Sequence, residues 1–98
     1  MKAIKFQHDP GHGWLEVSVE LLPTVGLTKD DFTGYSYESR DGKTVYLEED
    51  CDAYTFMQAW VKHFGKQPEV ESFGDAEWVR ALPRLDTNFG RDADSIAF

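Results

Sequence analysis

The stretch HDPGHGWLEV, residues 8–17, joins a tight turn to the start of a strand. Proline presets φ near −65° and glycine tolerates positive φ, so Pro10 and Gly11 suit the two central positions of a type II turn. Apolar and polar residues alternate on both sides of this turn, as they do in strands that bury one face. The sequence therefore predicts a strand at 2–8, a turn, and a second strand at 13–18.

Two further runs, 35–38 and 44–48, are rich in tyrosine, threonine and valine and flank Asp41-Gly42. An Asp-Gly pair between two such runs is a strong signal for a β-hairpin. A helix is predicted next, over 52–64, with Asp52 or Asp50 as its N-cap. Its apolar residues recur at helical spacing and draw one stripe, which we interpret as core rather than as a ligand site: Ala53, Phe56 or Met57, Trp60 and Phe64.

The expected architecture is an α+β domain with an antiparallel sheet of four to five strands. One main helix (about 52–64) packs on one face, and the element order is roughly ββ(α)ββαβα. A short helical turn at 19–25, a strand at 69–73 and a short helix at 75–82 complete this order. The 98 residues suit one compact domain, 1–98, in which 87–98 form a loosely ordered tail.

Composition narrows the class of protein. Hydrophobic residues make up 41% of the chain and aromatic residues 14%, which is enough apolar material to build a core. No apolar run approaches the roughly 20 residues that span a bilayer, and the first residues lack the apolar region of a signal peptide. The single cysteine, Cys51, excludes an internal disulfide and is expected to be a buried, inert thiol. We therefore expect a protein of the cytoplasm with no membrane partner.

The net charge of −8 is concentrated in one segment. Residues 30–52 hold eight acidic and two basic residues, so this segment alone carries −6. Such a field repels nucleic acid and attracts basic protein surfaces, although a solvated acidic face that only aids solubility is the alternative. The candidate partner-binding residues are the acids of the predicted hairpin and helix start: Glu38, Asp41, Glu48, Glu49, Asp50 and Asp52.

A secondary candidate site is the turn that carries His8, Asp9, His12 and Trp14. The common role of an aspartate here is to cap the turn backbone while both imidazoles point into solvent. A ligand contact and a metal site are the alternatives, since the turn would hold the two histidines on its shoulders. A zinc site needs four ligands at close quarters, and no downstream histidine or cysteine pair completes the set. We therefore expect no metal and no cofactor.

Signatures of catalysis are missing from the sequence. We find no phosphate-cradling glycine loop, no nucleophile elbow and no basic patch of the kind that binds nucleic acid. No catalytic residues are assigned, and an enzyme would have to be built on the turn of His8, Asp9 and His12 with a distant carboxylate.

Two blocks of the sequence, HDPGHGWLEV at 8–17 and YSY…TVYLEEDCD between 35 and 52, resemble a family of small uncharacterised proteins. Members of this family are carried by bacteriophages and related mobile elements, and the resemblance covers about the first 60 residues. The family has no assigned catalytic residues. The resemblance implies a context in which small proteins bind and disable host machinery, as anti-CRISPR and other anti-defence proteins do.

The sequence therefore leaves two classes of function open. The first is an inhibitor that binds a host protein complex, a bacterial defence component of the CRISPR-Cas type, by covering its basic nucleic-acid-binding surface. Such a protein would act in the cytoplasm of the bacterial host as a monomer or homodimer and would not bind nucleic acid directly. The second is a small-molecule-binding protein or small enzyme built on the turn between His8 and His12.

Overall fold

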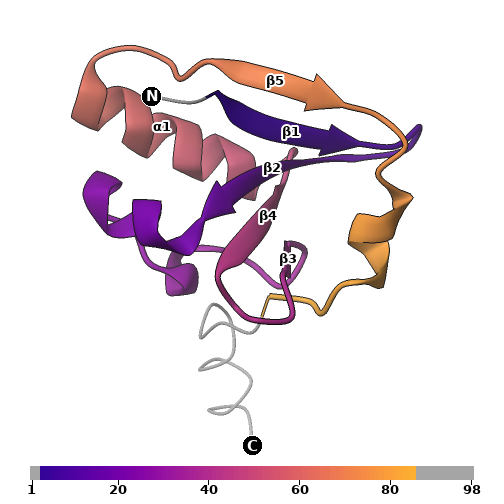
Figure 1. The fold of residues 1–98 in the computed structure, drawn as a ribbon. Coiled ribbons are helices and arrows are strands. Elements are labelled where there is room, and N and C mark those ends of the chain that lie inside the picture. The colour runs from indigo at the N-terminus through magenta and orange to yellow at the C-terminus, as the bar shows by residue number, and fades with distance from the viewer. Residues whose placement is uncertain (1–2, 86–98) are drawn as a thin grey trace, which may run out of the picture.

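The computed structural model describes residues 3–85, and these form one sheet with helical segments on both of its faces (Figure 1). The five strands lie in the order β3-β4-β2-β1-β5. Their bounds are β1 Ile4–His8, β2 Gly13–Ser18, β3 Tyr37–Glu38, β4 Thr44–Glu48 and β5 Val70–Phe73. The helical segments are α1 Asp52–Phe64 and three 3-10 helices, η1 Val19–Val25, η2 Lys29–Asp31 and η3 Glu77–Ala81. The prediction of an α+β domain with one main helix is confirmed.

The strands β1 and β2 form the predicted hairpin, in which His8 pairs with Gly13 at the closed end. The turn is not of type II, because Gly11 does not adopt a positive φ. The carboxylate of Asp9 accepts hydrogen bonds from the backbone N–H groups of Gly11 and His12, both at 2.9 Å. An aspartate turn of this kind satisfies the backbone without a left-handed residue, and the predicted capping role of Asp9 is confirmed.

One strand pairing differs from the antiparallel sheet that the sequence predicts. Strand β5 runs parallel to β1, with Ile4 opposite Val70 and Gln7 opposite Phe73. The connection through α1 explains this direction, because a helix between two strands returns the chain to the end where the first strand began. Strands β4 and β1 are both antiparallel to β2 and therefore point in the same direction. A β5 that is parallel to β4 is thus also parallel to β1.

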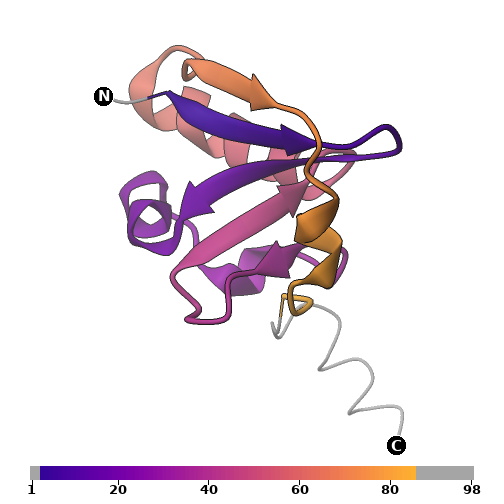
Figure 2. The same ribbon diagram turned by 45° about the vertical axis from the view of Figure 1, so that its right-hand side comes forward.

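Both faces of the sheet carry buried residues, and Figure 2 shows α1 behind the sheet and η3 in front of it. The main core lies between the sheet and the helices α1 and η1, and it includes Leu15, Val45, Leu47, Phe56 and Trp60. A smaller core on the opposite face joins the sheet to η3: Trp14, Tyr37, Tyr46, Ala76 and Val79. The alternation of side chains along β2 sends Leu15 to the first core and Trp14 to the second.

The helix boundaries agree closely with the pattern of apolar residues. Helix α1 spans the predicted residues and ends at Gly65, whose φ of 79° needs the left-handed region that glycine tolerates. The predicted turn at 19–25 is the 3-10 helix η1, and the helix predicted at 75–82 is the shorter 3-10 helix η3. The tail predicted at 87–98 lies outside the described residues.

Candidate functional site

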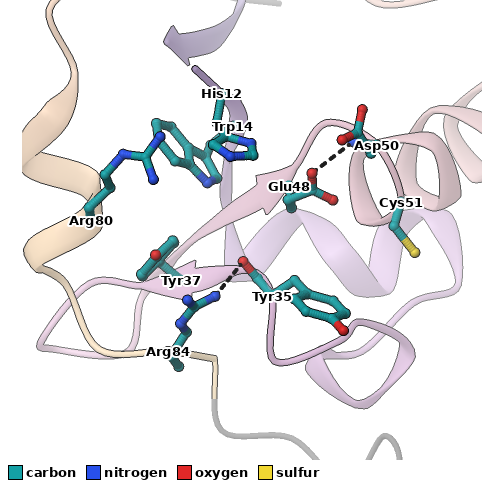
Figure 3. Close-up of a pocket in the computed structure, with 9 residues that line it drawn as sticks. All are labelled: His12, Trp14, Tyr35, Tyr37, Glu48, Asp50, Cys51, Arg80 and Arg84. Carbon is teal, nitrogen blue, oxygen red and sulfur yellow. Dashed lines mark hydrogen bonds between the residues drawn. The ribbon is translucent and has the colours of Figure 1, made fainter. Parts of the chain in front are cut away.

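A cavity of about 440 Å³ opens where β2, β3 and β4 meet the loop before α1 and the segment of η3 (Figure 3). Its volume lies in the range typical of small-ligand pockets. Three aromatic side chains, two arginines, a histidine, two carboxylates and the cysteine line it: Trp14, Tyr35, Tyr37, Arg80, Arg84, His12, Glu48, Asp50 and Cys51. The cavity therefore joins residues of both sites that the sequence suggests.

The floor of the cavity is aromatic. Trp14 and Tyr37 are buried, and their rings meet edge to face with centroids 6.0 Å apart. The imidazole of His12 lies 6.3 Å from the Trp14 ring, at the end of the hairpin turn. Tyr35, on the loop before β3, remains 69% exposed and stands at the rim. The floor is thus rigid, while one aromatic side chain is free to contact a bound molecule.

One wall of the cavity is basic. The guanidinium of Arg80 lies 5.3 Å from the Trp14 ring and donates two hydrogen bonds to Asp9, at 2.6 and 3.1 Å. Arg84 lies 4.7 Å from the Tyr37 ring and donates to the backbone carbonyl oxygens of Gly34 and Tyr35. The fork of a guanidinium suits such bidentate and stacked contacts, which hold both arginines in place.

The Arg80–Asp9 pair couples the turn to η3 and makes the stability of the fold dependent on pH. Hydrogen bonds from Arg80 and from the turn backbone hold the pKa of Asp9 well below its ordinary value. An aspartate with a lowered pKa in the folded state stabilises the protein above its unfolded pKa of about 3.9, and this contribution is lost as pH falls through that value toward the lower folded pKa.

We therefore expect Asp9→Asn to lower the melting temperature at neutral pH and to converge with the wild type in acid. The asparagine can still accept the two backbone hydrogen bonds of the turn, so the variant isolates the ion pair. Thermal melts from neutral pH down to strong acid measure the difference, and Arg80→Gln, which removes the same pair from the other side, should behave alike. A difference in melting temperature that is constant across pH would contradict this account.

The opposite wall is acidic and carries the one imidazole. Figure 3 shows Glu48 at the end of β4 and Asp50 in the loop that follows, with the Asp50 backbone N–H donating to the Glu48 carboxylate at 3.2 Å. One ligand atom from each of His12, Glu48 and Asp50 lies within 4.8 Å of the others. Burial raises the pKa of the Glu48 carboxyl; the Asp50 N–H opposes this, and the charge of Asp50 adds to it.

The six acids predicted as a partner surface do not form one neighbourhood. Asp52 is 1% exposed and is therefore not a surface residue, which corrects the sequence prediction. Its carboxylate accepts hydrogen bonds from the backbone N–H of Thr33 at 3.0 Å, from the Thr33 hydroxyl at 2.8 Å and from the Ser36 hydroxyl. The predicted N-cap role is also wrong, because α1 begins at Asp52 itself and Cys51 stands in the cap position without a side-chain hydrogen bond.

Glu38 and Asp41 lie at the far end of the β3–β4 hairpin, and their carboxylates contact residues nearby. Glu38 forms a salt bridge of 2.9 Å with Lys29, and Asp41 accepts from the Ser39 hydroxyl and the Lys43 backbone N–H. Glu38 is opposite Val45 in the ladder, three residues and roughly 10 Å along β4 from Glu48. Of the six acids, Glu48 and Asp50 line the cavity, and Glu49, between them in the chain, lines a neighbouring cavity that His12 shares.

The two histidines of the turn differ in their relation to the cavity described above. The ring of His8 stacks on Phe6 with centroids 6.0 Å apart, and His8 does not line the cavity. His12 and Trp14 do line it, whereas Asp9 supports it from behind through Arg80. His8 and His12 do share a second cavity of about 360 Å³, which Asp9 and Glu49 also line, so a ligand held between the two histidines stays a prediction.

Cys51 is exposed, which corrects the prediction of a buried thiol. Partial desolvation of the Cys51 thiol raises its pKa, and the negative charges of Asp52 and Glu48 raise this pKa further. A raised pKa disfavours the thiolate, which is the reactive form.

Sequence reasoning missed Tyr35, Tyr37, Arg80 and Arg84 as members of the site. The two arginines lie in the segment of η3 and after it, and no local pattern connects that segment with a turn about 70 residues earlier. The only signal for Tyr35 and Tyr37 is their presence in the second block of the family resemblance.

Comparisons of the chain with family models, with curated proteins and with solved structures found no match. The resemblance to phage-borne proteins therefore stays a prediction. Among residues 3–85, the structure contains no helix with the length and apolar character needed to cross a membrane.

Proposed function

We propose that this protein is an inhibitor that binds a basic surface of a host protein with Glu48, Glu49, Asp50 and the rim of the adjoining cavity. The observation that carries the proposal is the unmatched charge of this acidic rim. Within residues 3–85, no lysine or arginine forms a salt bridge with any of the three acids. Acids that lack an internal cation are available to a cation of a partner.

The aromatic rim adds a reason to expect a protein partner. Tyr35 is largely exposed and lies on the same cavity as Glu48 and Asp50. A lysine or arginine side chain that enters here would meet carboxylates on one side and the face of an aromatic ring on the other, which is a favourable setting for a cation. Arg80 opposes such a ligand only weakly, because its own charge is paired with Asp9.

The host target follows from charge and from the family resemblance together. A nucleic-acid-binding site of a defence complex presents clustered lysines and arginines, which a protein of net charge −8 would attract from a distance. The proposed target is accordingly a basic, nucleic-acid-binding subunit of a bacterial defence system of the CRISPR-Cas type, reached in the cytoplasm of the host cell.

The proposal predicts that reversal of Glu48, Glu49 and Asp50 together to lysine abolishes inhibition. Each exposed ion pair is worth only about 0–1 kcal/mol, so a single reversal should do little, whereas three together reverse the local field and slow association strongly. The measurement is phage plating on bacteria with an active CRISPR-Cas defence, with and without the expressed protein. The wild type should restore plaques and the triple variant should not.

The matched control reverses Glu20, Glu69 and Glu71, three exposed acids at the end of the sheet opposite the cavity. This variant has the same net charge as the first and should still inhibit. Equal loss in both variants would show that only total charge matters, and full activity of the first variant would overturn the proposal.

A second candidate function, binding of a small molecule, is favoured by the volume of the cavity and its polar groups on opposing walls. Ionic strength separates the two functions. Association that depends on charge steering weakens as salt rises, whereas a ligand enclosed by Trp14 and Tyr37 responds little.

A further inference from the structure

Three potential metal ligands from separate parts of the chain meet at the mouth of the cavity. His12 comes from the β1–β2 turn, Glu48 from the end of β4, and Asp50 from the loop before α1, and their ligand atoms lie within 4.8 Å of one another. Figure 3 shows all three side chains on the same side of the cavity. A nitrogen donor thus meets two carboxylates that lie 36 and 38 residues further along the chain.

The backbone fixes this convergence. Trp14 lies opposite Glu48 in the antiparallel ladder, and the backbone N–H of Glu49 donates to the carbonyl oxygen of Gly13 at 3.1 Å. The Glu48 N–H also donates to the hydroxyl of Ser36, itself held by the buried Asp52. The end of β4 is therefore tied on both sides, and the relative positions of His12 and Glu48 are set by the sheet rather than by chance on the surface.

The charge of the group is uncompensated. Glu48 is half-buried and stands next to Asp50, and among residues 3–85 neither carboxylate has a salt bridge to lysine or arginine. Two like charges held close together in a partly desolvated place favour the uptake of a cation. The imidazole beside them adds a donor that a transition metal prefers and that Mg²⁺ and Ca²⁺ do not require.

We propose that His12, Glu48 and Asp50 bind a divalent transition-metal ion, with Zn²⁺ the best match to one nitrogen and two oxygen ligands. Tetrahedral zinc holds its ligand atoms roughly 3.3 Å apart, so small rotations of the exposed His12 and Asp50 side chains complete the set. Three protein ligands leave a fourth position that opens into the cavity, as in zinc sites that take water or a further ligand.

This site goes beyond the proposed function, because metal binding needs no partner protein and is measured on the isolated chain. The test is calorimetric titration of tag-free protein with ZnCl₂. We expect one saturable site per chain, and His12→Gln, Glu48→Gln and Asp50→Asn should each weaken Zn²⁺ affinity at least about tenfold, the lower end of what even supporting residues of metal sites contribute. NMR of the histidine side chains should show a Zn²⁺-dependent shift of His12 that His8 and His63 do not share.

The matched controls are His63→Gln and Glu69→Gln, which remove an exposed imidazole and an exposed carboxylate outside the group. Both should bind Zn²⁺ as the wild type does, and circular dichroism verifies that all variants are folded. Absence of saturable Zn²⁺ binding, tighter binding of Mg²⁺ or Ca²⁺, or loss of binding in the His63→Gln protein would each overturn the assignment. The titration measures Zn²⁺ binding to the isolated chain and the plating assay measures inhibition in cells, so either test can fail while the other succeeds.

Discussion

Asp52→Ala is expected to lower the free energy of unfolding by about 3–4 kcal/mol, because it leaves three buried donors without their acceptor. The carboxylate is 1% exposed and accepts from the Thr33 backbone, the Thr33 hydroxyl and the Ser36 hydroxyl. Each hydrogen bond to a charged group contributes on the order of 1.5–3 kcal/mol, part of which offsets the desolvation of the carboxylate. Urea denaturation followed by tryptophan fluorescence measures the loss.

The control for this variant is Asp50→Ala, two residues earlier. Asp50 is exposed, and its truncation keeps the backbone N–H that donates to Glu48, so stability should change by less than about 0.5 kcal/mol. Equal destabilisation in the two variants would contradict the role given to Asp52. The two variants also distinguish the buried, structural Asp52 from the exposed Asp50, although the sequence analysis treats both as partner-binding acids.

Asp52 further links the fold to the site. It holds Thr33 and Ser36 at the two ends of the loop that carries Tyr35, and Ser36 in turn binds the backbone of Glu48. One buried carboxylate thus positions an aromatic and an acidic residue of the cavity rim. Variants of Asp52 should therefore impair binding at the cavity through loss of structure, which is why Asp52 is excluded from the charge-reversal test.

Local patterns in the sequence predict most of the fold. The alternation in 13–18 and 44–48 and the apolar stripe of 52–64 coincide with β2, β4 and α1, since each element buries a face through its own periodicity. The direction of β5 is not a local property, because it depends on how the α1 connection crosses the sheet. Periodicity cannot report such a crossing, and the antiparallel expectation fails there alone.

The site is harder to predict because its members meet only in three dimensions. The acidic run contains the right residues at Glu48 and Asp50, but composition cannot distinguish them from Asp52, whose partners lie 16 and 19 residues away. Similarly, the ligand group of His12 remains incomplete in the sequence, because Glu48 becomes its neighbour only through the β2–β4 ladder. Short-range spacing therefore identifies candidate residues but not the set that acts together.

Trp60→Ala should lower the free energy of unfolding by about 3–5 kcal/mol, the range for truncation of a buried aromatic side chain. Trp60 is 5% exposed in the main core, and its ring contacts those of Phe56 and Phe64 at centroid distances of 5.9 and 4.4 Å. The truncation leaves a cavity between α1 and the sheet that rigid neighbours cannot fill. A domain of this size has a total stability of about 5–15 kcal/mol, so the variant would approach the limit of folding.

Trp78→Ala is the matched control, since this tryptophan on η3 is 45% exposed and its ring forms a T-shaped pair with that of Tyr46, with centroids 5.6 Å apart. An aromatic pair of this kind is worth about 0.5–1.5 kcal/mol, so the control should cost far less than the core variant. Urea titrations of both proteins, followed by circular dichroism because each variant lacks one tryptophan, give the comparison. An unchanged denaturation midpoint for Trp60→Ala would mean that α1 does not pack on the sheet through this residue. The interpretation of the apolar stripe as the buried face of the helix would then be wrong.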